Sequence, residues 1–493
     1  MAKGKYRKVL FLNPSNTMPK DSARRLTTPL GFLYMGALLR DKGYDVKILD
    51  SPCEGYHKTS INGDYLTYGL SKEEISNRIK DYNPDIVGIT SMFSAHQENA
   101  IDHCNLVKKI NPDISVVLGG IHPSLAPKES IMNKSVDYVV IGEGEYRALN
   151  LLEALNKGET SLSFDGVAYK KNGEAIVNPL INRIKDLNAL PQPARDMINM
   201  ERYIQIGVPF GPFSKEDRVE QVMTSRGCPF DCVFCSTVNY WGHHFRTRSV
   251  DNIIEEIDDL TKNYGVKEIQ FADDNLTAHK PRAKELFKRL KPYNLSWCTP
   301  NGLMIQTLDE EMIDLMAQSG AYQLTFAVES GNERVRKEII NKRVPSKEKV
   351  KSLIDICHDK GVQVHGLFIV GFPGEKREEM EDTFNYPYEV GFDSASLFLA
   401  HPMIGSRLHK ICKEKGYLDS GVKGDLKHVA IKIPPTSADY IISPGELEKL
   451  VIEKTTAFNE YIKKKNPGAW ESKFKQFLKR HGDKADLILG RVT

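Results

Sequence analysis

The order of apolar and polar positions divides the chain into two stretches of alternating strands and helices. In the first stretch, short β-rich runs are separated by segments whose apolar residues recur every three to four positions. The predicted strands are 8–13, 45–49, 85–90, 115–118 and 136–141, and the predicted helices are 28–42, 95–110 and a third that starts at Tyr146. Strands separated by helices of this length predict an α/β fold with a parallel, doubly wound sheet. In such a sheet, ligands bind beyond the carboxyl ends of the strands.

The second stretch repeats the strand–helix pattern without a reversal. Its predicted strands are 219–224, 268–271, 296–299, 323–328, 362–370 and 394–400, with amphipathic helices between them. Six such units predict a partial or open barrel, whose active site would lie at the carboxyl ends of the strands. The resulting domains are 1–155 (doubly wound), 156–205 (a connector with a hairpin at 166–177), 206–420 (partial barrel) and 421–493 (mostly helical).

Composition and charge narrow the classes of partner. The 493 residues are 40% hydrophobic and 27% charged, which is typical of globular proteins. A net charge of +3 gives no reason to expect a nucleic-acid partner, and no apolar run reaches the roughly 20 residues of a membrane helix. With no signal-peptide pattern at the start, we expect a cytoplasmic protein. In the C-terminal region we expect a solvated basic helical face, and aromatic residues that pack against the barrel. The basic residues are Lys463, Lys464, Lys465, Lys473, Lys475, Lys479 and Arg480, and the aromatic ones are Trp470, Phe474 and Phe477.

Three of the eight cysteines crowd into eight positions, directly after the first barrel strand. Cys228, Cys232 and Cys235 can hold three irons of a cubane cluster and leave the fourth iron open for a substrate. A zinc site is the alternative, with His243 or His244 as a fourth ligand, but the chain has no second pair of closely spaced cysteines to build a zinc module. The spacing therefore favours a [4Fe-4S] cluster.

The other five cysteines are scattered, and we expect buried thiols without a chemical role. Cys298 ends the third barrel strand, so it is also a candidate catalytic donor or acceptor of a proton or hydrogen atom. A packed free thiol is the alternative at this position.

The cysteine loop resembles the CxxxCxxC loop of the radical S-adenosylmethionine (SAM) superfamily, whose fold is a six-unit, TIM-like partial barrel. Similar motifs follow at later strand ends. The resemblance implies SAM binding by Asp273 and Asp274 after the second strand, Glu329 and Ser330 after the fourth, and Gly371 and Pro373 after the fifth. Each motif alone is short, and Asp274 could be only a helix cap.

The first domain is similar to the Rossmann-like cobalamin-binding domains fused to radical SAM enzymes, through Pro29–Met35, Gly119–Ser124 and Gly142–Glu145. The resemblance implies cobalamin binding by Ser91, Ser94, Gly119, Gly120, Gly142 and Glu143. The DxHxxG motif, whose histidine binds cobalt in many cobalamin enzymes, is absent, and His122 lies outside any such motif. We therefore expect cobalamin without a histidine ligand from this chain, its lower face near 91–94 and 119–120.

Together these resemblances imply a cobalamin-dependent (class B) radical SAM methyltransferase. A [4Fe-4S] cluster and SAM would yield a 5′-deoxyadenosyl radical, and an unactivated carbon of a small-molecule substrate would be methylated. The expected electron donor is a protein such as flavodoxin or ferredoxin. Two alternatives stay open: rearrangement, ring contraction or cyclisation without net methyl transfer, and a non-enzymatic metal-binding protein.

Overall fold

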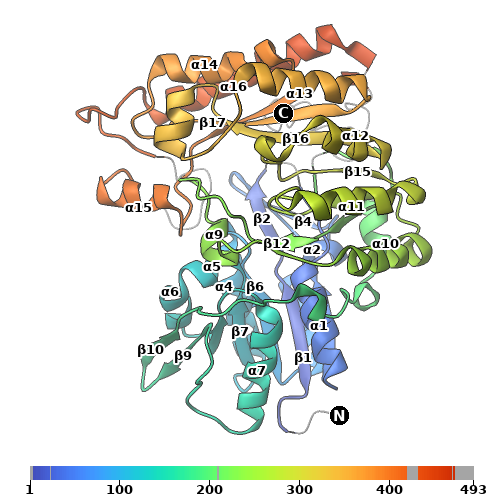
Figure 1. Cartoon of the computed structure of the whole chain (residues 1–493). Helices are drawn as coiled ribbons and strands as arrows, with labels where there is room; N and C mark the ends of the chain where they lie inside the picture. The colour runs from blue at the N-terminus through green and yellow to red at the C-terminus, as the bar shows by residue number, and fades with distance from the viewer. Residues whose placement is uncertain are drawn as a thin grey trace.

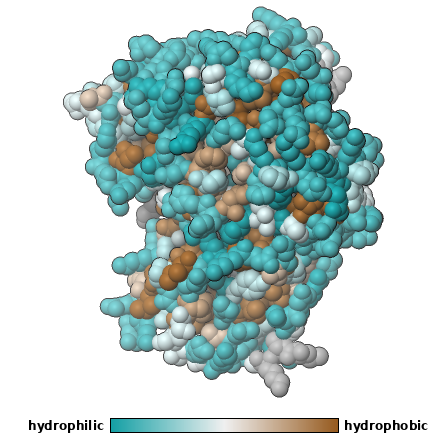
Figure 2. Space-filling model, viewed as in Figure 1, coloured by the Kyte–Doolittle hydropathy of each residue, from teal (hydrophilic) through white to brown (hydrophobic). Residues whose placement is uncertain are grey.

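The computed structural model describes residues 4–20, 22, 24–207, 210–211, 213–418, 431–468 and 470–471. Figure 1 shows two α/β units stacked on one another, with the N-terminal unit (blue to teal) below and the barrel unit (green to orange) above. Among the described residues, no helix combines the length and the apolar character needed to cross a membrane. The face in Figure 2 is covered mainly by hydrophilic side chains, and its outline is indented between the two units.

The N-terminal unit is built on a seven-stranded sheet in the order β10-β9-β8-β7-β6-β1-β3. Its strands are β1 (Lys8–Asn13), β3 (Asp45–Asp50), β6 (Ile86–Thr90), β7 (Ser115–Gly119), β8 (Tyr138–Val140), β9 (Val167–Lys171) and β10 (Glu174–Asn178). Within this sheet the neighbouring strands β3, β1, β6, β7 and β8 pair in parallel, as predicted. The strands β9 and β10 continue the sheet as an antiparallel hairpin. The sequence assigned this hairpin to the connector, whereas the structure adds it to the edge of the first sheet.

Helices cover both faces of this sheet, because its central strands bury apolar side chains on both sides. The helices are α1 (Leu30–Asp41), α2 (Ser51–Glu54), α3 (Lys72–Tyr82), α4 (Gln97–Ile110), α5 (Ile121–Leu125), α6 (Pro127–Met132) and α7 (Gly144–Asn156). One core contains Leu12, Val87 and Val116, and a second core on the other face contains Phe11 stacked on Phe32 at 4.9 Å.

A small antiparallel sheet in the order β2-β5-β4 was not predicted from the sequence. It consists of β2 (Asn16–Pro19), β4 (Thr59–Asn62) and β5 (Tyr65–Tyr68). Nearby, the buried Asp50 carboxylate accepts hydrogen bonds from the backbone N–H of Cys53 and from the hydroxyl of Tyr203. Tyr203 belongs to α8 (Met200–Ile206), so this contact ties the connector to the first domain.

The second unit is a six-stranded parallel sheet in the order β11-β14-β15-β16-β17-β18, which confirms the predicted partial barrel. Its strands are β11 (Val219–Val222), β14 (Glu268–Phe271), β15 (Ser296–Cys298), β16 (Ala321–Glu329), β17 (Gln363–Val370) and β18 (Ser394–Leu399). The helices outside it are α10 (Val250–Tyr264), α11 (Lys280–Leu290), α12 (Glu310–Gln318), α13 (Lys347–Asp359), α14 (Arg377–Val390) and α16 (Pro444–Lys465). Between sheet and helices, Trp297 stacks on Phe287 with ring centroids 5.0 Å apart.

Three shorter elements surround the end of β11: β12 (Ser225–Arg226), α9 (Thr237–Trp241) and β13 (Arg246–Thr247), with β12 pairing with β13. A further helix, α15 (Arg407–Glu414), follows β18. The predicted C-terminal helix is present as α16, which ends in the exposed residues 463–465. Lys473, Lys475, Lys479, Arg480, Phe474 and Phe477 lie outside the described residues.

Candidate functional site

The three clustered cysteines lie in the loop between β12 and α9, beyond the carboxyl end of β11. The loop is held from two sides, because the Val233 N–H donates to the Ile340 carbonyl and the Val233 carbonyl accepts from the Leu408 N–H, each at 2.8 Å. Ile340 ends a π-helical turn, a feature frequent at functional sites. Burial raises the pKa of Cys228 to about 11 and that of Cys232 to about 12, so metal binding must displace their protons.

The three clustered cysteines are the metal ligands that the sequence predicts, for a cluster rather than for a zinc ion. Within the described ranges, no group of three His, Cys, Asp or Glu side chains is arranged to hold a single metal ion. His243 and His244, the candidate fourth zinc ligands, are exposed. In a cubane each cysteine binds a different iron, so the three sulfurs need not converge on one point. The thiols of Cys228, Cys232 and Cys235 are nevertheless close enough to influence one another electrostatically.

Glu329 ends β16 with a backbone φ of 70°, a left-handed conformation that is unusual for a side-chain-bearing residue. The pairing of β16 with β17 shifts register just before it. Its Oε1 atom accepts a hydrogen bond from Lys342 Nζ at 2.7 Å, and both side chains are buried. Strained residues of this kind cluster at ligand sites. Because Lys342 also acts electrostatically on Cys228 and Cys232, this ion pair lies beside the cysteine loop.

The two aspartates after β14 have different surroundings. Asp273 accepts hydrogen bonds from the backbone N–H of Thr224 at 3.1 Å and its hydroxyl at 2.7 Å, so it fastens the end of β11. The charge of Asp274 adds to the effect of burial in raising the pKa of Cys228 and of Cys235. Asp274 therefore lies near the predicted iron–sulfur cluster. Of the two predicted SAM contacts, Asp274 is therefore the one that lies near the cysteines.

The turn after β17 is closed by its own carboxylate. Glu375 Oε2 accepts from the backbone N–H groups of Gly371 at 2.6 Å and Phe372 at 3.0 Å, and its Oε1 is buried without a hydrogen-bond partner among the described residues. The backbone N–H of Gly371 is thus occupied. After β16, Ser330 Oγ lies 3.0 Å from Thr383 Oγ1, which fixes the neighbouring turn. Roles for Gly371, Pro373 and Ser330 in SAM binding stay predictions.

Cys298 lies deep in the barrel and is only 4% exposed. Burial raises its pKa far above the ordinary value, with Glu268 adding to the effect and a hydrogen bond to Tyr322 opposing it. Tyr322 in turn donates to Glu268 Oε1 at 2.8 Å, and Glu268 is the first residue of β14. These partners lie toward the amino end of the barrel, so the contacts favour a packed thiol. A catalytic role for Cys298 stays a prediction.

The carboxyl edge of the N-terminal sheet carries the residues predicted to bind cobalamin. Ser91 is fully buried, and its N–H donates to the Gly119 carbonyl at 2.8 Å. Ser94 Oγ lies 2.9 Å from His122 Nδ1, whose ring is buried and whose Nε2 has no hydrogen-bond partner among the described residues. Burial lowers the pKa of His122, which favours the neutral ring.

The backbone at Gly119 has open space around it. A Cβ atom at Gly119 would come within 4 Å of only one neighbouring atom among the described residues, the Val140 carbonyl oxygen at 3.9 Å. Two large apolar side chains after β6, Met92 and Phe93, are 51% and 48% exposed. Exposed apolar groups next to an open backbone are typical of a ligand site. Gly120 differs, since its Cβ would lie 2.5 Å from the Ser91 carbonyl oxygen.

The loop after β8 joins the two units through buried charges. Arg226 Nη1 donates to Glu143 Oε1 at 2.8 Å, and its Nη2 donates to Glu145 Oε1 at 2.6 Å. Arg246 Nη1 contacts both carboxylate oxygens of Glu143 at 2.8 Å. In the same loop, the Gly142 carbonyl accepts from the Tyr240 hydroxyl at 3.1 Å. Gly142 and Glu143 therefore contact the barrel unit in addition to their predicted place beside cobalamin.

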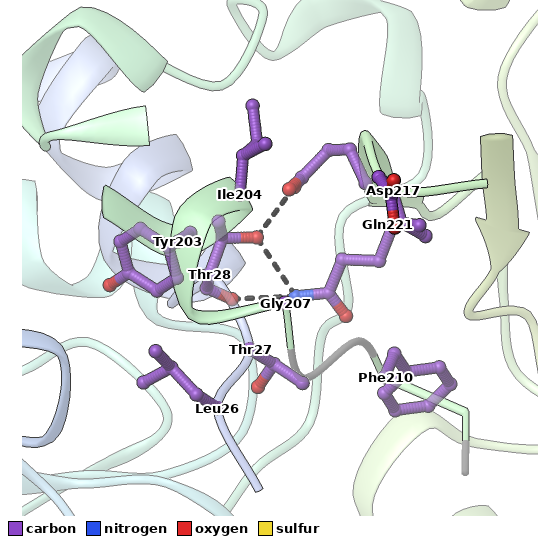
Figure 3. Close-up of a pocket in the computed structure, with 11 residues that line it drawn as sticks. Leu26, Thr27, Thr28, Tyr203, Ile204, Gly207, Phe210, Asp217 and Gln221 are labelled. Carbon is purple, nitrogen blue, oxygen red and sulfur yellow. Dashed lines mark hydrogen bonds between the residues drawn. The ribbon is translucent and has the colours of Figure 1, made fainter. Parts of the chain in front are cut away.

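A small pocket lies at the opposite, amino end of β11, between residues 26–28, 203–207 and 217–221 (Figure 3). Its polar side chains bind one another: Gln221 Nε2 donates to the Thr28 carbonyl at 2.6 Å, and Thr28 Oγ1 donates to Glu220 at 2.6 Å. Because Thr28 belongs to the N-terminal unit and Glu220 and Gln221 lie on β11, the pocket is part of the interface between the two units.

Sequence reasoning did not single out Lys342, Arg226 or Arg246 for the site, and it noted Glu145 only as part of the motif Gly142–Glu145. Arg226 stands two residues before Cys228, so proximity in sequence was an available signal. Lys342 lies 13 residues beyond Glu329 in a polar stretch, where no pattern marks it.

Family models agree with this geometry. The model of the radical SAM superfamily matches residues 222–386, and that of the B12 binding domain matches residues 20–152. The chain belongs to the radical SAM enzymes that carry a B12-binding domain, which confirms the family and the fold class predicted from the sequence. Its cofactors are SAM, a [4Fe-4S] cluster and cobalamin, and its class of activity is that of the cobalamin-dependent methyltransferases.

Individual relatives extend this result. The chain is 38% identical to cytidylyl-2-hydroxyethylphosphonate methyltransferase of Streptomyces wedmorensis, over 84% of this chain and 83% of that protein. It is 28% identical to anaerobic magnesium-protoporphyrin IX monomethyl ester cyclase of Rubrivivax gelatinosus, over 80% of this chain and 68% of that protein. Its fold is similar to that of TsrM, a radical SAM methyltransferase from Kitasatospora setae solved with cobalamin and a [4Fe-4S] cluster. The TM-score is 0.69 at 16% identity, covering 92% of this chain and 91% of that one.

Proposed function

We propose that this enzyme transfers a methyl group to an unactivated carbon of a small molecule, and that the substrate carries a phosphonate or nucleotide group. The observation that carries the proposal is the contact between the two predicted cofactor regions. Arg226, two residues before Cys228, forms ion pairs with Glu143 and Glu145 of the first domain. A methyl donor held by one domain and a radical formed in the other would therefore meet at this interface. The substrate class rests on the relative that is 38% identical.

The chain's own residues would hold each cofactor as follows. Cys228, Cys232 and Cys235 would bind the cluster, and Lys342 would balance the negative charge of the thiolates. Lys342 also offers an ammonium group to the carboxylate of SAM, and Glu329 offers a carboxylate to its hydroxyl or amino groups. With these groups bound, the cluster and SAM supply a 5′-deoxyadenosyl radical and cobalamin supplies the methyl group.

Apolar packing around the cysteine loop would keep water from the reacting atoms. Phe372 is fully buried, and its ring centroid lies 6.2 Å from that of Phe234, the residue before Cys235. Both rings belong to an apolar cluster that also contains Val233 and Leu408. Exclusion of water protects reactive intermediates from side reactions, which radical chemistry requires.

The cofactor edge of the first domain would receive cobalamin on its open backbone at Gly119, with Met92 and Phe93 as apolar contacts. Ser91, Ser94, Gly120, Gly142 and Glu143 complete this proposed edge. We further propose a low-potential protein donor such as flavodoxin or ferredoxin, and a cytoplasmic location, where thiols stay reduced.

The test is anaerobic incubation of the reconstituted enzyme with SAM, cobalamin, a reductant and cytidylyl-2-hydroxyethylphosphonate or other phosphonates and nucleotides. Methyl-deuterated SAM labels the transferred group. We expect a product that gains one labelled methyl group by mass spectrometry. The cyclase relative supports a second candidate, ring formation or rearrangement, which would give 5′-deoxyadenosine and a converted substrate without the labelled methyl. If the enzyme converts none of the phosphonates and nucleotides in this panel, the proposed substrate class is contradicted.

A further inference from the structure

The contact between the two units is a compact, buried group of charges, called here the Glu143–Arg226 cluster and consisting of Glu143, Glu145, Arg226 and Arg246. Its side chains are between 0% and 9% exposed. Arg226 forks between two carboxylates, while Glu143 in turn is shared by two guanidinium groups. The four side chains carry balanced charge, and every ion pair in the cluster joins the N-terminal unit to the barrel unit.

The cluster is anchored to the elements that carry the two cofactor sites. Arg226 and Arg246 are register partners on β12 and β13, so they present their guanidinium groups together. On the other side, the Glu143 and Glu145 side chains extend from the start of α7, directly after β8. The Ile184 N–H also donates to Glu143 Oε2 at 3.0 Å, which fixes that carboxylate further.

Glu143 remains ionised in this buried setting. Burial alone would raise the pKa of Glu143, but the charges of Arg226 and Arg246 hold it below its usual range. An arginine that forks between two carboxylates defines both distance and angle, because its donors form a rigid planar set. A lysine or a neutral amide at the same place would keep a contact without this geometric restriction.

The Glu143–Arg226 cluster is connected to a second set of buried charges through Tyr34 of α1. The guanidinium of Arg226 lies over the Tyr34 ring at 5.4 Å, and Arg248 Nη1 donates to the Tyr34 hydroxyl at 3.2 Å. Arg248 also pairs with the buried Glu256. The interface is therefore held by connected ionic contacts, and displacement of one unit would break several of them together.

We propose that Glu143 and Glu145 are positioning residues that, through Arg226, hold the carboxyl edge of the N-terminal sheet at a fixed distance from the cysteine loop. This rests on the proposed function, because the purpose of a fixed distance is to bring the methyl donor within reach of the substrate radical. Chemistry between two bound groups is sensitive to their separation, so a small displacement lowers the yield of the coupled step. All the proposed SAM ligands lie in the barrel unit, so we expect SAM cleavage to be unaffected by this separation.

The test measures the distance between the units without relying on cobalamin. A nitroxide is attached to a cysteine introduced at Met132, which lies on α6 and is 51% exposed. Pulsed EPR then gives the distance distribution from this nitroxide to the reduced cluster in the full chain. We expect one narrow distribution, which Glu145→Gln and Arg226→Lys broaden or shift while iron content stays the same.

A matched control is Asp165→Asn, which removes a carboxylate that pairs with Arg147 inside the N-terminal unit. We expect the control to leave the distance distribution unchanged. With a substrate present, Glu145→Gln should give at least tenfold less methylated product per 5′-deoxyadenosine, and the control should not.

Two results would overturn the inference: identical distributions in the wild type, Glu145→Gln and Arg226→Lys, or a broadened distribution with an unchanged ratio of product to 5′-deoxyadenosine. Failure of the proposed function is recognised separately. In that case the wild type forms no methylated product with any substrate. The distance measurement still reports whether the Glu143–Arg226 cluster holds the two units together.

Discussion

Lys342 Nζ lies 2.7 Å from Glu329 Oε1, and the two side chains are 5% and 7% exposed. Lys342 follows the π-helical turn that supports the cysteine loop, whereas Glu329 ends the fourth barrel strand. The pair therefore brings a positive and a negative charge from different elements to one place beside Cys232. We propose that this ion pair separates to bind the zwitterionic methionyl end of SAM.

We expect Glu329→Gln and Lys342→Met each to raise the Kd for SAM at least tenfold, because each removes one of the two charges offered to the ligand. Each single change also leaves a buried charge without its partner, which costs about 3–5 kcal/mol of folding free energy. The double variant should recover much of this stability and still bind SAM weakly. Anaerobic calorimetry and urea unfolding measure the two effects, and unchanged SAM affinity in both single variants would make the pair purely structural.

The three-cysteine loop should bind about four irons per chain after anaerobic reconstitution, as expected for one cubane cluster. Replacement of Cys228, Cys232 and Cys235 together by alanine should remove the iron and the EPR signal of the reduced cluster. Cys412→Ala is the matched control, since Cys412 is buried in the same apolar cluster without belonging to the motif. A full cluster in the triple variant, or zinc in place of iron in the wild type, would contradict this assignment.

Enlarging Gly119 should block cobalamin binding, because a side chain there would extend into the open space at the sheet edge. We expect Gly119→Leu to abolish saturable binding in an absorption titration with hydroxocobalamin, while iron content and SAM affinity stay normal. Gly120 is a poor position for this test. Its φ of 108° and the 2.5 Å approach of the Ser91 carbonyl mean that a side chain would disturb the loop itself.

His122→Ala should leave the EPR spectrum of bound cobalt(II) unchanged, because we expect cobalt to lack a histidine ligand from this chain. The variant is informative because His122 Nε2 is buried without a hydrogen-bond partner among the described residues. Loss of a nitrogen-coordinated spectrum in His122→Ala would show instead that this ring binds the cobalt.

Asp50 should make the stability of the protein depend on pH. Burial raises its pKa from 3.8 to about 6, despite hydrogen bonds from Tyr203 and Cys53 that oppose the shift. The folded state therefore binds this proton more tightly than the unfolded state. The stabilising contribution is complete below about pH 4 and is lost as the pH rises through about 6, and a shift of this size corresponds to about 3 kcal/mol.

Asp50→Asn cannot ionise, so we expect it to be more stable than the wild type at pH 7.5, by up to about 3 kcal/mol, and to lose this advantage at pH 4. Urea unfolding of the cluster-free full chain at both pH values measures the difference. Asp251→Asn is the control, since the Asp251 side chain is 80% exposed. An advantage of Asp50→Asn that is the same at both pH values would contradict the assignment.

The sequence by itself determined most of what is local. Lys8–Asn13 and Glu268–Phe271 were predicted with the bounds that the structure has, because each is a short β-type run set off from the helical patterns that follow it. The cysteines Cys228, Cys232 and Cys235 likewise lie within one loop, so their motif can be recognised without any other part of the chain. The small sheet was missed for the corresponding reason. All four residues of β4 are exposed, and such a strand has no apolar alternation to mark it.

Only the tertiary structure decided which charges meet. Arg226 and Glu143 are separated by 83 positions, and Lys342 reaches Glu329 from a different element. The sequence marked Glu143 and Glu329 as candidate ligand residues, but it did not reveal Arg226 or Lys342 as their partners, since a charged side chain carries no periodic signal of its partner. Burial of these charges is favourable only where the packed units bring opposite charges together. The pairing of Arg226 with Glu143 therefore follows from how the two units fold against each other, and that of Lys342 with Glu329 from how elements of the barrel pack together. Local sequence patterns encode neither.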